Sequence, residues 1–369
     1  MRMLHTIRYG RHYDDFVPGA VYEHPWEVTI DEGMLAFFAA SFQDAIPTHA
    51  SKRVATNLGF PDRPVHPLVL LNLGLSFSVH DVSEQAIAHL AYLSVRFPNA
   101  CFPGDSVSAR SRVIGMRPVS TGEKGVVHVR TEVRNQRGDI VCSFERKVLV
   151  RALRSVDPSS QAAPPVVAEY DVSNDELARA PAHLLRNLPS HPALGSFPTY
   201  WEDFSVGDVY AHEVGRTVSE AEHMQLSTLC RNSHPLHFDE RYCQKHSFAK
   251  TRVVFGGLVL AWVLALTSRD TAGNAIWDFG LDDGAHPSGV LAGDTLYAAS
   301  SVLAKEDRGP HAGLVTLRIV GLKNTPARVL LERGDDLFTP ELGKSSGRVL
   351  EKAVEITRTL LVRKRAERA

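Results

Sequence analysis

Two short segments of the chain each combine a histidine with a side chain that can bind water. Asp44 lies five residues before His49, and Asn232 lies five residues before His237, with a proline between the partners in both cases. A histidine and a carboxylate at this spacing can point at one water molecule, and the imidazole can take a proton from it. Asn232 cannot act as a base, but its amide can orient water. The segments therefore predict general acid–base chemistry on water.

The two segments belong to a repeat that runs through most of the chain. Residues 15–22 (DFVPGAVY) recur as residues 203–210 (DFSVGDVY), a shift of 188 residues, and the same shift carries His49 onto His237. An isolated Asp-x4-His pair arises often by chance, so the weight of the prediction rests on this ordered recurrence. Further matches are residues 102–107 with 291–296 and residues 146–151 with 358–363.

The repeat divides the chain into two domains and a connection. We expect an N-terminal domain over residues 1–151 and a C-terminal domain over residues 198–369. Residues 152–197 are rich in Pro, Ala and Ser and predict a linker that wraps the surface, with one short helix near residues 175–186.

Each half has the same expected elements. Residues 31–42 and 219–230 are apolar-periodic and open with Asp or Ser as a helix cap. Residues 65–79 and 253–267 are apolar runs long enough to be buried helices. One long buried helix wrapped by an antiparallel sheet in each half gives an α+β fold. The alternating stretches that predict the strands include residues 126–133 and 314–320.

Composition excludes several classes of protein. Lys and Arg number 41 against 42 Asp and Glu, and this balance argues against a nucleic-acid partner. No window approaches the roughly 20 apolar residues of a membrane helix, and residues 1–20 hold no signal-peptide core. The four cysteines form no CxxC pair, which favours free thiols in a reducing compartment. We therefore expect a cytoplasmic protein with no membrane partner.

Several motifs resemble those of a known family. Residues 44–49 (DAIPTH) resemble the Asp-x-x-Pro-x-His motif of MaoC-like enoyl-CoA hydratases, and residues 232–237 (NSHPLH) carry the same motif with Asn in place of Asp. Residues 63–66 (RPVH) resemble the segment before the family's hot-dog helix. Over nearly the whole chain outside the linker, the sequence is similar to the two-domain mesaconyl-CoA hydratases, also called β-methylmalyl-CoA dehydratases. The segments that carry this similarity include residues 200–204, 220–225, 232–237, 254–257 and 292–297.

The resemblance implies a fold and a reaction. The fold would be a double hot-dog, two fused hot-dog halves in one chain. The reaction would be the reversible hydration of an α,β-unsaturated acyl-CoA thioester, with mesaconyl-CoA and β-methylmalyl-CoA as the expected pair. No metal or redox cofactor is implied, since coenzyme A is part of the substrate. Two fused halves already make a dimer-like unit, and a homodimer is compatible with this arrangement.

The resemblance also implies how a complete site is built. Besides the histidine, the family uses a backbone N–H at the start of the buried helix to hold the thioester oxygen as it gains charge. In the first half, Asp44 and His49 are both present, but Pro67 stands in the glycine position and has no N–H. Asp44 and His49 are therefore the alternative catalytic pair, in a half that would otherwise shape the pocket.

The second half keeps the glycines and loses the carboxylate. Gly256 and Gly257 stand at the expected start of its buried helix, while Asn232 replaces the aspartate. We favour this half as the working site. His237 would be the acid/base, Asn232 would hold the water, and Gly256 with Gly257 would bind the thioester oxygen.

Two arginines near this motif are candidates for substrate binding. A mesaconyl group carries a carboxylate, and arginine is suited to bind one in a bidentate manner. Arg252 and Arg231 could fill this role, although a surface salt bridge is an equal expectation for each.

Other histidines have simpler interpretations. We expect His66 to cap the helix that follows it or to bond within the core, in preference to catalysis. His223, His234, Asp239 and His246 lie close together in sequence, but their spacing matches no zinc-ligand pattern, so no metal site is expected.

Three other functions stay open at this stage. An (R)-specific enoyl-CoA hydratase for fatty acyl chains would need an apolar tunnel in place of a cation. A hot-dog thioesterase would release free coenzyme A. Because each half lacks one part of the family's site, a non-catalytic acyl-CoA binder is the third alternative.

Overall fold

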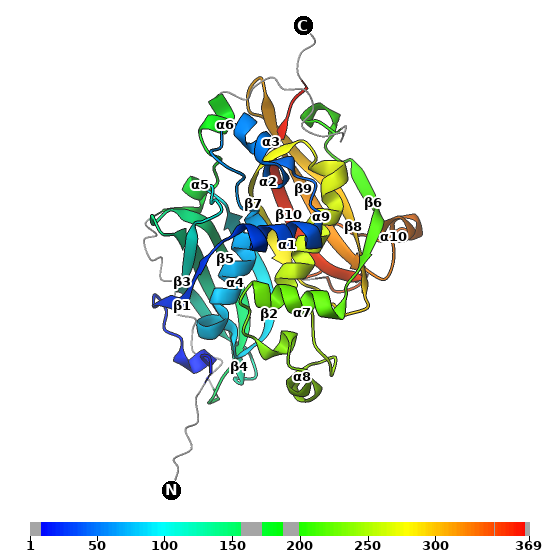
Figure 1. The fold of residues 1–369 in the computed structure, drawn as a ribbon. Coiled ribbons are helices and arrows are strands. Elements are labelled where there is room, and N and C mark those ends of the chain that lie inside the picture. Colours follow the sequence, from blue (N-terminus) through cyan, green and yellow to red (C-terminus); the bar gives the residue numbers. More distant parts are fainter. Residues whose placement is uncertain (1–8, 156–171, 187–198, 343, 366–369) are drawn as a thin grey trace.

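Ten antiparallel strands form one continuous sheet to which both halves of the chain contribute (Figure 1). The computed structural model describes residues 9–155, 172–186, 199–342 and 344–365. The strand order is β1-β3-β4-β5-β2-β7-β10-β9-β8-β6, so each strand of the first half has its repeat partner at the mirrored place. The strands are β1 Val21–Thr29, β2 Ala86–Arg96, β3 Ser106–Pro118, β4 Lys124–Asn135, β5 Ile140–Arg151, β6 Val209–Thr217, β7 Ala275–Ala285, β8 Thr295–Asp307, β9 Ala312–Lys323 and β10 Lys352–Arg363.

The halves meet at the centre of the sheet. Strands β2 and β7 pair there, with Tyr92 opposite Gly284 and Val95 opposite Leu281. A side chain on β2 or β7 can therefore contribute to a site in the other half. The helices are α1 Glu32–Phe42, α2 Pro47–Ala50, α3 Lys52–Asn57, α4 Pro67–Phe77, α5 Asn174–Leu177, α6 His183–Arg186, α7 Glu220–Leu229, α8 Glu240–His246, α9 Gly256–Thr271 and α10 Ala327–Arg333, with shorter turns η1 Tyr13–Asp15, η2 Val79–Ser83, η3 Trp201–Asp203 and η4 Pro235–His237.

Helices α4 and α9 are the two buried helices that the sequence predicts. Every residue of α4 is buried, and the largest apolar cluster runs through both helices and both halves of the sheet. The helices touch near their first turns, where Asn72 Nδ2 lies 3.3 Å from the carbonyl oxygen of Gly257. A methyl group on Gly257 would meet Asn72 Oδ1 at 2.1 Å, so only glycine allows this close approach. The predicted α+β class is confirmed.

Most predicted elements form with small shifts at their ends. Helix α1 begins after Asp31, whose side chain accepts the Met34 N–H at 2.7 Å. Helix α7 begins after Ser219, but the Ser219 side chain makes no capping hydrogen bond. The predicted single helix near residues 175–186 is wrong, because two separate turns, α5 and α6, form on either side of Pro181.

The predicted domain boundaries stay predictions. Much of the expected linker, residues 156–171 and 187–197, lies outside the described residues. In the part of the chain that the structure describes, no helix has the length and apolar character to cross a membrane.

Candidate functional site

A cavity lies where the start of α9 faces strands β2 and β5 of the first half. Three residues predicted for the site line it together, namely Asn232, His237 and Gly256. First-half residues complete the wall, including His89 and Arg146. We call this the second-half cavity. The pairing of β2 with β7 explains why one half alone does not enclose it.

His237 is held as a neutral base. It ends the turn η4, and its Nδ1 donates to the carbonyl oxygen of Val253 at 2.8 Å. That bond places the ring proton on Nδ1 and leaves the lone pair of Nε2 free. Burial lowers the pKa of His237 to about 4, so the imidazole is uncharged at pH 7. An uncharged imidazole with a free Nε2 can accept a proton from water.

Asn232 offers a hydrogen-bond donor beside His237, and His234 lies next to both. Asn232 Oδ1 accepts the N–H of His234 at 3.0 Å, so the side-chain NH2 group of Asn232 remains to donate to a ligand. The Nδ1 of His234 accepts the N–H of Leu236 at 3.1 Å, which places the ring proton on Nε2. Burial lowers the pKa of His234 to about 3 and keeps this ring neutral. The Nε2 proton of His234 is engaged by the backbone of Glu84, so a water oxygen can accept from Asn232 while the water donates to His237.

Gly256 is the first residue of α9 and lines the cavity, while Gly257 faces Asn72 across the helix contact. The first N–H groups of a helix have no partner within the helix and suit an oxygen that gains negative charge. A methyl group on Gly256 would lie 2.9 Å from His286 Nε2. Glycine thus leaves room for an oxygen beside an unused N–H.

Four lining residues were not predicted from the sequence. His286 Nε2 lies 3.1 Å from the hydroxyl of Tyr92, and the rings of Tyr92 and His89 are 4.1 Å apart. Burial lowers the pKa of His286 to about 4 and that of His89 well below its ordinary value, so both are neutral at pH 7. Burial also lowers the pKa of Arg146 to about 10, which leaves this guanidinium charged.

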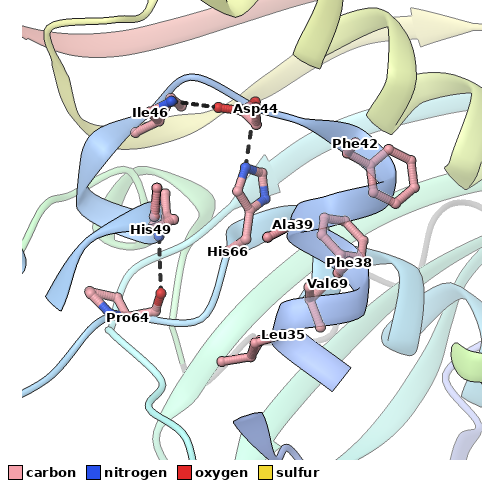
Figure 2. Close-up of a pocket in the computed structure, with 11 residues that line it drawn as sticks. Leu35, Phe38, Ala39, Phe42, Asp44, Ile46, His49, Pro64, His66 and Val69 are labelled. Atoms are coloured by element: carbon pink, nitrogen blue, oxygen red, sulfur yellow. Dashed lines mark hydrogen bonds and ion pairs between the residues drawn. The ribbon is translucent and has the colours of Figure 1, made fainter. Parts of the chain in front are cut away.

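The first half has two adjoining pockets at the place that corresponds to the second-half cavity. Asp44, His49 and His66 line one of them (Figure 2), and His49 and Pro67 line the other. We call the two together the first-half cavity. His49 Nδ1 lies 3.2 Å from the carbonyl oxygen of Pro64, as His237 lies against Val253. Burial lowers the pKa of His49 to about 3. The two histidines are therefore held alike.

The carboxylate of this first-half cavity has a histidine partner. Asp44 Oδ1 accepts the N–H of Ile46 at 2.8 Å, and Asp44 Oδ2 lies 3.5 Å from His66 Nε2 (Figure 2). Burial alone would raise the pKa of Asp44, but His66, the charge of Arg358 and the Ile46 N–H together outweigh it, and the pKa is lowered. His66 also caps α4, since its Nδ1 accepts the Leu68 N–H at 3.1 Å, which confirms the capping prediction.

The helix that opens onto this cavity begins with Pro67. Proline favours the first helical position and provides no N–H there. Asp44 and His49 are thus brought together, but Pro67 offers no donor for a thioester oxygen.

The two arginines predicted to bind substrate are placed elsewhere. Arg252 forms ion pairs with Glu220 and with Glu240, the latter at 3.7 Å. Arg231 is exposed and has a left-handed backbone, with φ of 63°. Neither belongs to the described lining of the second-half cavity, whose arginine is Arg146. Among the described residues, no group of three or more His, Cys, Asp or Glu is arranged to hold a metal ion.

Several known proteins are similar to this chain in sequence and in fold over most of their length. The family model described as mesaconyl-CoA hydratase matches residues 2–332. The chain belongs to the mesaconyl-CoA hydratase family. A mesaconyl-CoA hydratase of Cereibacter sphaeroides is 32% identical to this family member over 332 residues, covering 90% of this chain and 94% of that protein. A β-methylmalyl-CoA dehydratase of Chloroflexus aurantiacus is 30% identical, covering 86% and 89%.

Solved structures have the same fold. The crystal structure of a putative MaoC domain protein dehydratase from Chloroflexus aurantiacus has a TM-score of 0.81 and 28% identity, covering 97% of this chain and 98% of that chain. A conserved hypothetical protein of Mycobacterium tuberculosis, described as having a double hot-dog fold, has a TM-score of 0.70 and 20% identity, covering 96% and 99%. The predicted double hot-dog fold is thereby confirmed.

Proposed function

We propose that this family member adds water to mesaconyl-CoA, and removes it from β-methylmalyl-CoA, in the second-half cavity. The observation that carries the proposal is the meeting of His237, Asn232 and Gly256 in one cavity at the start of α9. The names of the relatives support the substrate pair. As predicted from the resemblance, the reaction would need no redox cofactor, and coenzyme A enters only as part of the substrate.

The hydration step balances with one base. His237 Nε2 takes a proton from a water molecule that Asn232 holds by donating to its oxygen. The hydroxide adds to the β-carbon, the double-bond electrons move toward the thioester, and the Gly256 N–H holds the resulting enolate oxygen. Protonated His237 then gives its proton to the α-carbon. Asn232 exchanges no proton, so we assign both transfers to His237, and dehydration is the reverse.

The cavity's chemistry also supports a dicarboxylic substrate. Among the described lining residues, the ionisable groups are four histidines, Tyr92 and Arg146, with no carboxylate. Since the histidines are neutral at pH 7, the cavity carries one positive charge. A fatty acyl chain would gain nothing from that charge.

Loss of the enoyl-thioester absorbance with mesaconyl-CoA and crotonyl-CoA tests the proposal. We expect hydration of mesaconyl-CoA, at a kcat/KM well above that for crotonyl-CoA. A parallel thiol-trapping assay detects free coenzyme A. Equal rates with the two thioesters would refute the dicarboxylic substrate, and thiol release without hydration would replace the hydratase with a thioesterase.

A further inference from the structure

The second-half cavity contains a buried cation without an anion. Arg146 on β5 is only 3% exposed, and it lines the cavity. Its Nη2 donates to Ser78 Oγ at 2.8 Å, and its Nε has no hydrogen-bond partner. Among the described residues no carboxylate pairs with this guanidinium. A buried charge is costly unless it is paired, so an unpaired one in a cavity wall points to an anionic ligand.

The repeat offers a matched arginine in which the charge is already paired. Arg358 occupies on β10 the position that Arg146 occupies on β5, and it lies opposite Leu281 as Arg146 lies opposite Tyr92. Arg358 donates to Asp278 Oδ2 from Nε at 2.8 Å and from Nη2 at 2.6 Å. Both side chains of this pair are 1% exposed. The charge of Arg358 is therefore already paired with a carboxylate.

A single residue difference between the central strands β2 and β7 explains why Arg358 is paired and Arg146 is not. Asp278 on β7 pairs with Leu360 on the neighbouring strand, and His89 on β2 pairs with Val148 in the same register. His89 thus stands where the other half has the aspartate. The Nε2 of His89 donates to the carbonyl oxygen of Ala91 at 2.9 Å, so this ring does not supply a negative charge to Arg146.

From this juxtaposition we propose that Arg146 binds the free carboxylate of the acyl group and so selects a dicarboxylic acyl-CoA. The inference rests on the proposed function and assigns its substrate choice to one side chain. His89 is the positioning residue that keeps Arg146 unpaired. The first-half cavity cannot take the same substrate carboxylate, because Asp278 occupies the matched guanidinium.

The phosphates of coenzyme A are the other anions that this substrate carries. Crotonyl-CoA has the same phosphates and lacks the second carboxylate, so it separates the two sources. For Arg146→Gln we expect kcat/KM for mesaconyl-CoA to fall by about 100-fold or more, as for loss of one partner of a buried charge pair. The kcat/KM for crotonyl-CoA should change by less than about threefold. An equal loss with both thioesters would overturn the assignment to the acyl carboxylate.

Two further variants keep the test independent of folding. Lys147→Gln removes a cation one residue along β5, where the side chain is exposed, and should leave both rates unchanged. His89→Asp copies the first half and retains Arg146, yet it should lower the rate with mesaconyl-CoA as Arg146→Gln does. Arg146→Lys should recover part of the preference. Full activity of His89→Asp on mesaconyl-CoA would contradict the proposal.

Binding without turnover separates this inference from the proposed function. Succinyl-CoA and butyryl-CoA have no reactive double bond and differ by one carboxylate. Calorimetry should show tighter binding of succinyl-CoA to the wild-type protein and loss of that difference in Arg146→Gln. If the wild type hydrates neither enoyl thioester but keeps this difference, the proposed function fails and Arg146 retains its role. Equal affinities for the two ligands in the wild type would remove that role.

Discussion

The first-half and second-half cavities share one backbone layout, and three of the matched positions at which they differ bear directly on the proposed chemistry. Asp44 in the first half corresponds to Asn232, and Pro67 corresponds to Gly256. The third position is Asp278, next to the first-half cavity, which corresponds to His89. The histidine base is present on both sides. What separates the cavities is the N–H donor and the free cation, and both belong to the second half.

The comparison shows that the carboxylate and the helix-start N–H donor lie in different halves of the molecule. The first half retains the carboxylate that a family site uses, but His66 lies 3.5 Å from it and the helix start has no donor. The second half has no carboxylate at that position, and a negative charge there would lie in a cavity whose one cation, among the described lining residues, is Arg146. The loss of Asp at position 232 is thus consistent with an anionic substrate.

The largest effect should come from the two matched histidines. His237→Ala removes the group to which we assign both proton transfers, and we expect kcat to fall by roughly 10³- to 10⁴-fold. His49→Ala should change kcat by less than about threefold. Steady-state hydration of mesaconyl-CoA by both variants measures the difference. The opposite ranking would transfer the active site to the first half.

Breaking the buried ion pair should affect stability more than rate. Asp278→Asn leaves Arg358 buried without its partner, and we expect a loss of about 3–5 kcal/mol in the free energy of unfolding. His89→Asn, at the matched position, breaks no ion pair and should cost less than about 1 kcal/mol. Urea unfolding followed by circular dichroism compares them. Equal losses would show that the two arginines are in similar environments.

One substitution gives helix α9 the first residue of helix α4. Gly256→Pro copies Pro67, keeps a residue that suits the first helical position, and removes the N–H, so kcat should fall by about 10²- to 10³-fold. Gly256→Ala keeps the N–H and adds a methyl group 2.9 Å from His286 Nε2, so it measures the cost of filling that space. A further drop from Ala to Pro reports the donor. A kcat of Gly256→Pro close to that of the wild-type protein would exclude Gly256 as the oxyanion donor.

The smallest expected effect is on the pH profile of kcat/KM, whose acid limb should be shifted to a lower pH. Burial lowers the pKa of His237 to about 4, so the base stays neutral and active until the pH approaches that value. Below it, protonation removes the base, and kcat/KM should fall about tenfold per pH unit. A pH profile from 3.5 to 8, with circular dichroism at each pH, measures this. A limb near the ordinary histidine value of about 6.5 would show that His237 is solvated or is not the base.

The sequence predicts local elements well because their signals are local. Asp31 marks the start of α1 by capping it. The second buried helix was predicted to end at Thr267 but continues to Thr271. Its polar final turn breaks the apolar pattern, yet Thr267 and Thr271 bond back to carbonyl oxygens of the helix. Periodicity cannot detect a helix end that is held by its own hydroxyl groups.

Only the site residues that lie in the repeated motifs were predicted from the sequence. His237, Asn232 and Gly256 lie in motifs, whereas His89 and Arg146 lie on strands of the other half. Their contribution depends on strand register and on the pairing of β2 with β7, neither of which follows from local pattern. One signal was available, since Arg146 and Arg358 open matching apolar strand ends. An arginine kept at such a place in both halves could have been chosen over Arg231 and Arg252.

Locating the bound acyl group tests the central claim most directly. Crystals of His237→Gln grown with mesaconyl-CoA would hold the thioester without rapid turnover. We predict the thioester oxygen beside the N–H of Gly256 and the free carboxylate on Arg146, with the first-half cavity unoccupied by the acyl group. An acyl group bound between Asp44 and His49 would contradict the account.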